Sequence, residues 1–145
     1  NSKINEIINE NITDDMKVED KILKIHDYII NNTKYDTANS DSKSSTAYGA
    51  LINHKAVCGG YADAMALFLN KFNVPNFKIA SNTHVWNAVY IDSAWLHLDL
   101  TWDDPVSSSG EDTILHKFYL IDTPSLEKYK ITDHEYDKTI YEELS

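Results

Sequence analysis

Residues 56–64 read Ala-Val-Cys-Gly-Gly-Tyr-Ala-Asp-Ala and contain the one cysteine of the chain, Cys58. Apolar side chains recur at helical spacing from Tyr61 to Phe72, so we expect Cys58 at or just before the start of a helix. The exposed N–H groups and the positive dipole at a helix start lower the pKa of a thiol. Cys58 is therefore a candidate nucleophile, although lone cysteines are more often inert buried side chains.

Composition limits the possible functions. The chain has 145 residues, of which 42% are hydrophobic and 11% aromatic, which is typical of one globular domain. Its net charge of −10 argues against binding to nucleic acid, whose phosphates require a basic surface. All 13 basic residues are lysines, so an arginine clamp for a phosphate is not available. No apolar run reaches the length that a membrane span needs.

The residues before the cysteine motif predict two amphipathic helices within residues 1–32. Isoleucines at helical spacing indicate a first helix that ends near Asn11. We expect Asp14 or Asp15 to cap a second helix that ends at Asn31-Asn32. The side chains expected to face the core from this second helix are Val18, Ile22, Ile25 and Ile29. His26 lies beside them, as is typical of a hydrogen-bonded structural histidine.

After Phe72 the hydrophobic pattern alternates, which predicts strands. We expect strands at 77–80, 84–91 and 94–101, with Asp92-Ser93 as a two-residue hairpin turn between the last two. Further along, the pattern predicts a strand over 115–121 and a short helix over 123–130. The acidic tail after this helix is expected to be a solvated segment or a truncated linker.

The proposed hairpin turn sets a register that brings two chemically important side chains together. Tyr90 then faces Trp95, and His84 and Asp99 become diagonal neighbours on the same face of the sheet. A carboxylate beside an imidazole is a common way to orient a catalytic base. If the cysteine helix packs on this face, Cys58, His84 and Asp99 form a nucleophile, a base and an orienting residue.

Three separated motifs occur in order along the chain. They are Ala47-Tyr48-Gly49-Ala50-Leu51 leading to Ala56-Val57-Cys58-x-Gly60-Tyr61-Ala62, then His84-x-Trp86-Asn87, then His97-x-Asp99-x-Thr101-Trp102-Asp103-Asp104-Pro105. In these motifs the chain resembles the bacterial transglutaminase-like superfamily. The resemblance covers about Ile25 to Pro105, and the tail is similar at Phe118-Tyr119-Leu120 and at Asp133-His134.

This resemblance implies an α+β, papain-related fold, in which N-terminal helices and a cysteine-bearing helix pack on an antiparallel β-sheet. Residues 1–145 would form a single transglutaminase-like domain. Its parts would be N-terminal helices at 1–32, a catalytic core at 46–121 and a C-terminal extension at 122–145. Carried over by motif, Cys58 is the nucleophile, His84 the general acid and base, and Asp99 the residue that orients the imidazole.

Other residues are candidates for oxyanion or substrate binding. The backbone N–H of Cys58 could donate to the oxyanion, and Tyr48 could supply a second donor. Gly59 leaves the backbone open to close approach by a substrate carbonyl. Trp86 and Trp102 could line an acyl-donor groove, although aromatic residues on a sheet face more often belong to the core.

The implied reaction is cysteine-dependent acyl transfer on protein amides through a thioester, as in glutamine–lysine cross-linking or deamidation. The partners would be a protein or peptide carrying an amide and, for cross-linking, a lysine amine. The motifs call for no cofactor and no resident metal. Secretion or display at the cell surface is expected from the acidic surface and the habits of the family.

Three alternatives remain open. The first is a cysteine peptidase or amidase of the same fold, and the second is an inactive extracellular module that binds protein or glycan. The third is a metal site, because Cys58, His84, His97 and Asp99 are all ligand types, although they lack the close paired spacing of a zinc site. Calcium could bind a set of aspartates, but their spacing matches no calcium loop. That set is Asp92, Asp103, Asp104 and Asp112.

Overall fold

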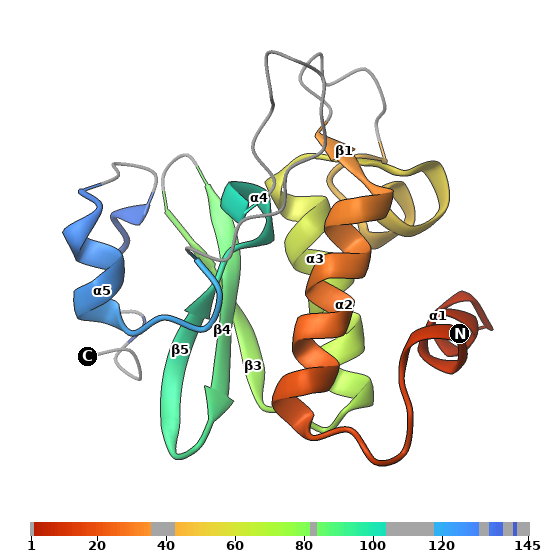
Figure 1. The fold of residues 1–145 in the computed structure, drawn as a ribbon. Helices are drawn as coiled ribbons and strands as arrows, with labels where there is room; N and C mark the ends of the chain where they lie inside the picture. The colour runs from red at the N-terminus through yellow and green to blue at the C-terminus, as the bar shows by residue number, and fades with distance from the viewer. Residues whose placement is uncertain are drawn as a thin grey trace.

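A computed structural model describes residues 2–35, 43–81, 84–103, 118–130, 134–137 and 141, without the side chains of Ser2 and Trp102. A three-stranded sheet in the order β3-β4-β5 forms the centre, with α2 and α3 beside one another on one face and α5 on the other side (Figure 1). This is the α+β arrangement that the motifs predicted. In the described part of the chain, no helix is both long and apolar enough to cross a membrane.

The two N-terminal helices form where the isoleucine pattern predicted them. α1 spans Ser2–Asn11 and α2 spans Val18–Asn32. The side chains that α2 buries include Ile22, Ile25 and Ile29. Two details of the prediction are wrong. Lys17, rather than Asp14 or Asp15, occupies the N-cap position. Val18, expected to face the core, is the first residue of the helix and is exposed.

A short two-stranded sheet holds the chain on its way into the cysteine helix. β1 (Lys34–Tyr35) follows α2 and pairs in parallel with β2 (Lys55–Ala56), which immediately precedes Val57 and Cys58. Between them lies a π-helical turn, η1 (Gly49–Asn53). The residues just upstream of Cys58 are therefore held by backbone pairing with the segment that follows α2.

α3 spans Cys58–Lys71 and is the central helix of the apolar core. Its first turn lies directly against the backbone of residues 44–46, where a Cβ atom at Gly60 would collide with the carbonyl oxygen of Ser44. At Gly59 the nearest atom to such a Cβ would be the Ser45 carbonyl oxygen at 3.2 Å. The close approach at Gly60 thus serves this chain's own backbone.

The antiparallel sheet has the predicted register. β3 spans Asn76–Ala80, β4 spans Val85–Ile91 and β5 spans Ala94–Leu98. Tyr90 pairs with Trp95 and Ile91 with Ala94. Asp92 and Ser93 both have positive φ, at 52° and 66°, which is the geometry of a type I′ hairpin turn. The two-residue turn therefore fixes which side chains share each face.

The face on which α3 packs differs from the expectation. α3 shares its core with Val89, Ile91 and Leu98. These side chains lie on one face of the sheet, here called the aliphatic face. The amide of Asn87, on that same face, donates to the backbone oxygen of Ala62 in α3 at 3.0 Å. Side chains of the opposite face belong to a second cluster, which contains Ile79, Trp86, Ala88, Phe118 and Leu126.

The chain after β5 departs from a simple strand. Residues 100 and 101 were expected to end the strand over 94–101, but they belong to a short helix, α4 (Leu100–Asp103). Of the strand predicted at 115–121, residues 115–117 lie outside the described part, and Ile121 makes a single bridge to His97. α5 (Thr123–Lys128) confirms the predicted helix and is capped by Asp122, whose side chain accepts from the Ser125 N–H.

Candidate active site

Cys58 begins α3 and is half-buried. Its thiol hydrogen-bonds with the side chain of His84 and accepts from the backbone N–H groups of Val85 and Gly59. Burial alone would raise the pKa of this thiol. The bond with His84, the charge of that imidazole and the two N–H groups outweigh burial and hold the pKa of Cys58 below its ordinary value. The site therefore favours a thiolate.

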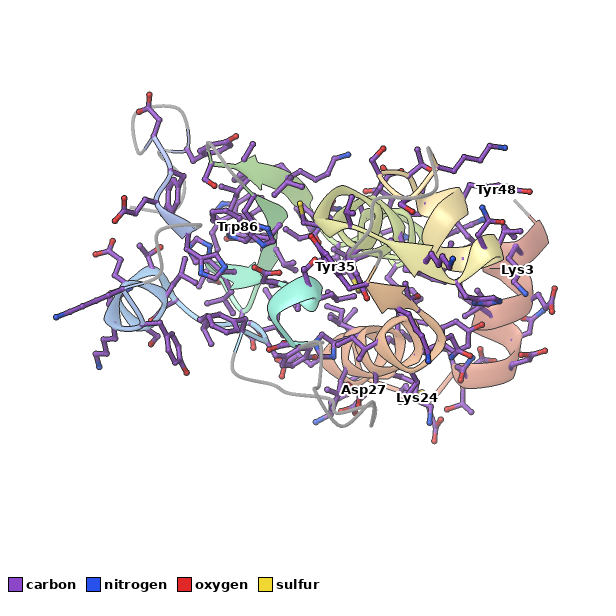
Figure 2. All side chains as sticks on the ribbon, turned by 90° about the horizontal axis from the view of Figure 1, so that it is seen from above. Lys3, Lys24, Asp27, Tyr35, Tyr48 and Trp86 are labelled. Carbon is purple, nitrogen blue, oxygen red and sulfur yellow. The ribbon has the colours of Figure 1, made fainter. Side chains whose placement is uncertain are left out.

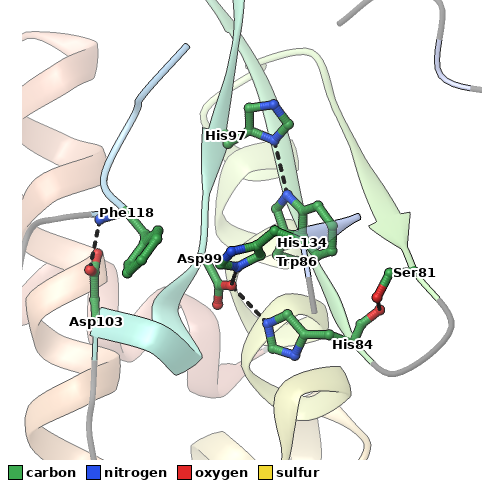
Figure 3. Close-up of polar contacts among 8 residues, drawn as sticks. All are labelled: Ser81, His84, Trp86, His97, Asp99, Asp103, Phe118 and His134. Atoms are coloured by element: carbon green, nitrogen blue, oxygen red, sulfur yellow. Dashed lines mark hydrogen bonds and ion pairs between the residues drawn. The ribbon is translucent and has the colours of Figure 1, made fainter. Parts of the chain in front are cut away.

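His84 directly precedes β4 and connects the thiol to a carboxylate. Its Nε2 lies 2.7 Å from Oδ2 of Asp99 (Figure 3). This contact leaves Nδ1 for the bond with Cys58. Burial alone would lower the pKa of His84. Its hydrogen bonds with Asp99 and Cys58 and the charges of these two groups raise that pKa to about 10. A protonated imidazole beside a thiolate is the state that this geometry stabilises.

Asp99 lies between β5 and α4 and is 1% exposed. Its backbone N–H donates to the Phe118 carbonyl at 2.9 Å, so its position is fixed by a segment distant in sequence. Burial alone would raise the pKa of this carboxyl. Hydrogen bonds from His134 and His84 outweigh burial and hold the pKa of Asp99 below its ordinary value. Asp99 is thus ionised and accepts from both imidazoles.

The three residues meet although α3 packs on the opposite face from the one expected. Cys58 is at the end of α3, and its sulfur meets the N–H of Val85 at the first residue of β4. His84 and Asp99 flank the same end of strands β4 and β5. The start of the helix therefore reaches the end of the sheet where these two side chains lie.

His134 is a member of this site that the sequence analysis did not identify. Its Nε2 lies 2.6 Å from the same Oδ2 of Asp99 that His84 contacts. The tail was expected to be solvated, but His134 is 6% exposed, and Tyr136 packs on Trp86 at 5.9 Å between ring centroids. That expectation is therefore wrong for these residues. The sequence signal that could have identified His134 was the family resemblance at Asp133-His134, to which no function was assigned.

Trp86 and His97 form a polar contact next to His84, Asp99 and His134. The Nε1–H of Trp86 donates to Nδ1 of His97 at 3.0 Å (Figure 3). His97 therefore carries its proton on Nε2, which lies 3.0 Å from Oγ1 of Thr123. Burial is the main cause that lowers the pKa of His97 to about 4. Trp86 is fully buried in the second core cluster and stacks on His84 at 5.7 Å between ring centroids. It therefore supports the imidazole from within the core.

The remaining predicted binding residues lie as follows. Tyr48 is 50% exposed, Nζ of Lys43 lies 4.4 Å from its ring centroid, and it lies on the outer side of the helical layer, away from Trp86 (Figure 2). The backbone N–H of Gly59 helps to lower the pKa of the Cys58 thiol. The side chain of Trp102 is outside the described part of the chain. Their roles in substrate binding stay predictions.

The side chains of His84, Asp99 and His134 each offer one atom that could bind a metal, and these atoms lie within 4.8 Å of one another. This set replaces the predicted one, because His97 contacts Trp86 and Thr123 instead. The two nitrogens lie 2.7 and 2.6 Å from the Asp99 oxygen. Ligands around tetrahedral zinc lie ~3.3 Å apart, given bonds of about 2.0–2.1 Å. The spacing fits hydrogen bonds better than a metal.

The proposed calcium ligands do not come together where the structure describes them. Asp92 lies in the turn between β4 and β5, whereas Asp103 ends α4 at the other end of the sheet (Figure 1). Asp103 is buried and accepts from His26 and from the N–H of Phe118. Asp104 and Asp112 lie outside the described residues.

Comparison with known proteins agrees with this geometry. Residues 5–100 match the family described as the transglutaminase-like superfamily. No curated protein sequence matches the chain. One similar solved structure is described as a crystal structure of a TGase, with a TM-score of 0.61 and 21% identity over 76% of this chain and 35% of that one. Another is a candidate cysteine protease from Cytophaga hutchinsonii, with a TM-score of 0.55 and 20% identity over 79% of this chain and 41% of that one. This chain thus spans well under half the length of either structure.

Proposed function

Because the chain belongs to the transglutaminase-like superfamily, whose members are typically cysteine enzymes, we propose that it transfers acyl groups from protein amides through a thioester on Cys58. The observation that carries the proposal is the continuous contact from the Cys58 thiol through His84 to the buried Asp99 carboxylate. Enzymes that form covalent acyl intermediates have this spatial arrangement, in which the nucleophile contacts the base and the base contacts an orienting residue. Cys58 is the nucleophile, His84 the general acid and base, and Asp99 orients the imidazole.

The first half of the reaction forms the thioester. The Cys58 thiolate attacks the amide carbonyl carbon, and the electron pair of the C=O bond moves to oxygen. When the tetrahedral intermediate collapses, the C–N bond breaks and Nδ1–H of His84 protonates the departing nitrogen. A glutamine side chain then releases ammonia and leaves its acyl group on sulfur.

The second half resolves the thioester. His84, now neutral, takes a proton from water or from a lysine amine as that group attacks the acyl carbon. Collapse of this second intermediate breaks the C–S bond and restores the thiolate beside a protonated His84. Water gives the acid, which is deamidation, and a lysine amine gives an isopeptide cross-link. The backbone N–H of Cys58 is the proposed donor to the oxyanion in both halves.

A cysteine peptidase is the second candidate function. It is favoured by the likeness to the structure described as a candidate cysteine protease. The chemistry up to the thioester is the same, except that the departing nitrogen belongs to a backbone amide. An inactive binding module is the third possibility, and it requires that Cys58 form no acyl intermediate.

One assay distinguishes these possibilities. The protein is incubated with a glutamine-containing peptide, with and without a labelled primary amine, while ammonia, label incorporation and new peptide termini are followed together. Incorporation means cross-linking, ammonia alone means deamidation, and new termini mean proteolysis. The matched control is Cys58→Ser, which keeps the size of the side chain and should abolish each signal. Absence of every signal across a panel of peptides would contradict the proposal.

A further inference from the structure

One oxygen atom of Asp99 is shared by two imidazoles that come from different parts of the chain. Nε2 of His84 lies 2.7 Å from Oδ2, and Nε2 of His134 lies 2.6 Å from the same atom (Figure 3). Because Asp99 is ionised, it can only accept, so both nitrogens donate. The proposed mechanism uses the His84 bond and assigns nothing to the His134 bond.

Aromatic packing fixes the ring of His134 in this position. It meets Trp86 edge-on at 5.0 Å between centroids and Phe118 at 5.1 Å. Trp86 belongs to β4, whereas His134 follows Asp99 by 35 positions. The donor therefore reaches the carboxylate only when the segment that carries His134 packs against the sheet.

We propose that His134 is a positioning residue, whose Nε2–H holds the Asp99 carboxylate in place as an anion so that His84 stays protonated and directed at Cys58. The proposal extends the proposed function and rests on it for the catalytic consequence. His134 would touch neither the substrate nor the sulfur and would act mainly through Asp99, although its ring also meets that of His84 edge-on at 5.6 Å between centroids.

The physical reason is the cost of a buried carboxylate. Asp99 is fully buried, and burial favours the neutral acid unless donors compensate. If the His134 donor is lost, Asp99 takes up a proton more readily, and a neutral Asp99 no longer stabilises the His84 imidazolium. The thiolate of Cys58 then loses the positive charge beside it, and its pKa rises towards that of an ordinary thiol.

The other ionisable groups near Asp99 do not replace this donor. His97, in β5 two positions before Asp99, has its pKa lowered to about 4 mainly by burial, so it is neutral at physiological pH. Asp103, one helical turn further on, carries the same sign of charge and accepts from His26. Cys58 is in contact with His84 and lies beyond it from Asp99.

The test separates the hydrogen bond of His134 from its packing. His134→Leu fills the space of the ring with an apolar side chain but removes the donor. His134→Gln keeps an N–H near the position of Nε2. Tyr136→Leu is the matched control, because it removes an aromatic contact with Trp86 from the same segment and leaves the bonds of Asp99 intact. Folding of each variant is checked by urea unfolding.

The first measurement is the rate of Cys58 alkylation by iodoacetamide from pH 5.5 to 9, followed by mass spectrometry. For His134→Leu we expect the acidic limb of the profile to move to higher pH, with the rate near pH 6 lower by on the order of 10- to 100-fold. His134→Gln should stay within about threefold of the wild-type rate, and Tyr136→Leu should follow the wild-type profile. On an amide substrate, His134→Leu should lower kcat with little change in KM.

Three results would overturn the proposal. They are an unchanged profile in folded His134→Leu, equal impairment of the leucine and glutamine variants, and an equal effect of Tyr136→Leu. If His134→Leu does not fold, the His134→Gln variant decides. Because glutamine keeps a donor near Asp99, an alkylation profile of His134→Gln that is displaced as far as the profile of Asp99→Asn would contradict the proposal. Alkylation needs no substrate, so this comparison still tests His134 if the protein processes no amide and the proposed function fails.

Discussion

His26 of α2 and Asp103 of α4 form a buried contact, with Nε2 and Oδ2 separated by 2.9 Å and by 77 positions in sequence. The same carboxyl group accepts from the N–H of Phe118 at 2.9 Å. Phe118 in turn accepts from the N–H of Asp99 through its carbonyl. The contact thus joins the N-terminal helices to the turn that places Asp99.

Removing His26 is expected to destabilise the fold. Burial is the main cause that raises the pKa of Asp103, and His26 opposes it. His26→Ala would leave this carboxyl buried without its main partner, and we expect a loss of about 3 kcal/mol in the free energy of unfolding. Urea unfolding at pH 7 measures this loss. Lys24→Ala, at an exposed position of the same helix, is the control and should change stability by less than about 0.5 kcal/mol. Equal effects of the two substitutions would refute the structural role of the contact.

The two glycines after Cys58 should differ in their tolerance of alanine. A Cβ at position 60 would collide with the Ser44 carbonyl oxygen, whereas at position 59 the closest atom lies 3.2 Å away. Gly60→Ala is therefore expected to cost about 1–3 kcal/mol of stability and to shift the start of α3. Gly59→Ala should cost clearly less, and thermal unfolding of the two variants side by side makes the comparison. A larger loss for Gly59→Ala would contradict the packing described for the first turn of α3.

His97 should make the protein less stable in acid. Its pKa is about 4 in the folded state, and an unfolded histidine titrates near about 6.5. Between these values the unfolded state binds more protons, so stability falls as the pH is lowered from about 6.5 to about 4, by up to about 3 kcal/mol.

His97→Asn removes this titration and keeps an oxygen that can accept from Trp86. Its stability should therefore fall less than that of the wild type between pH 7 and pH 4.5 in urea unfolding. His54→Asn is the control, because His54 is exposed and its φ of 60° suits asparagine. The prediction fails if both variants lose as much stability in acid as the wild type.

The parts of the site that sequence predicted correctly are those fixed by local rules. Helical spacing put Cys58 at the start of a helix, and a two-residue turn at Asp92-Ser93 set the register that makes neighbours of His84 and Asp99. These features depend on residues close together in the chain, so the pattern contains them.

The features that sequence missed depend on how distant segments pack. Nothing in the strand pattern showed that α3 would pack on the aliphatic face of the sheet. Cys58, its first residue, reaches His84 from the end of the helix. Leu100–Asp103 are helical rather than extended, and Asp103 at the end of this helix contacts His26, a partner far away in the chain. His134 lies in an acidic stretch without hydrophobic period, so its burial could not be seen before the tail was placed against Trp86.

The pH dependence of Cys58 alkylation tests the central claim, that His84 holds Cys58 as a thiolate. The pKa of Cys58 is lowered and that of His84 is raised to about 10, so the pair favours a thiolate beside an imidazolium at neutral pH. We expect the wild-type rate with iodoacetamide to change less than about threefold from pH 7 to 9. In His84→Ala the rate should rise on the order of 20-fold over that range, as for an ordinary thiol with a pKa of about 8.5. A wild-type rate that rises as steeply as that of His84→Ala would contradict the account.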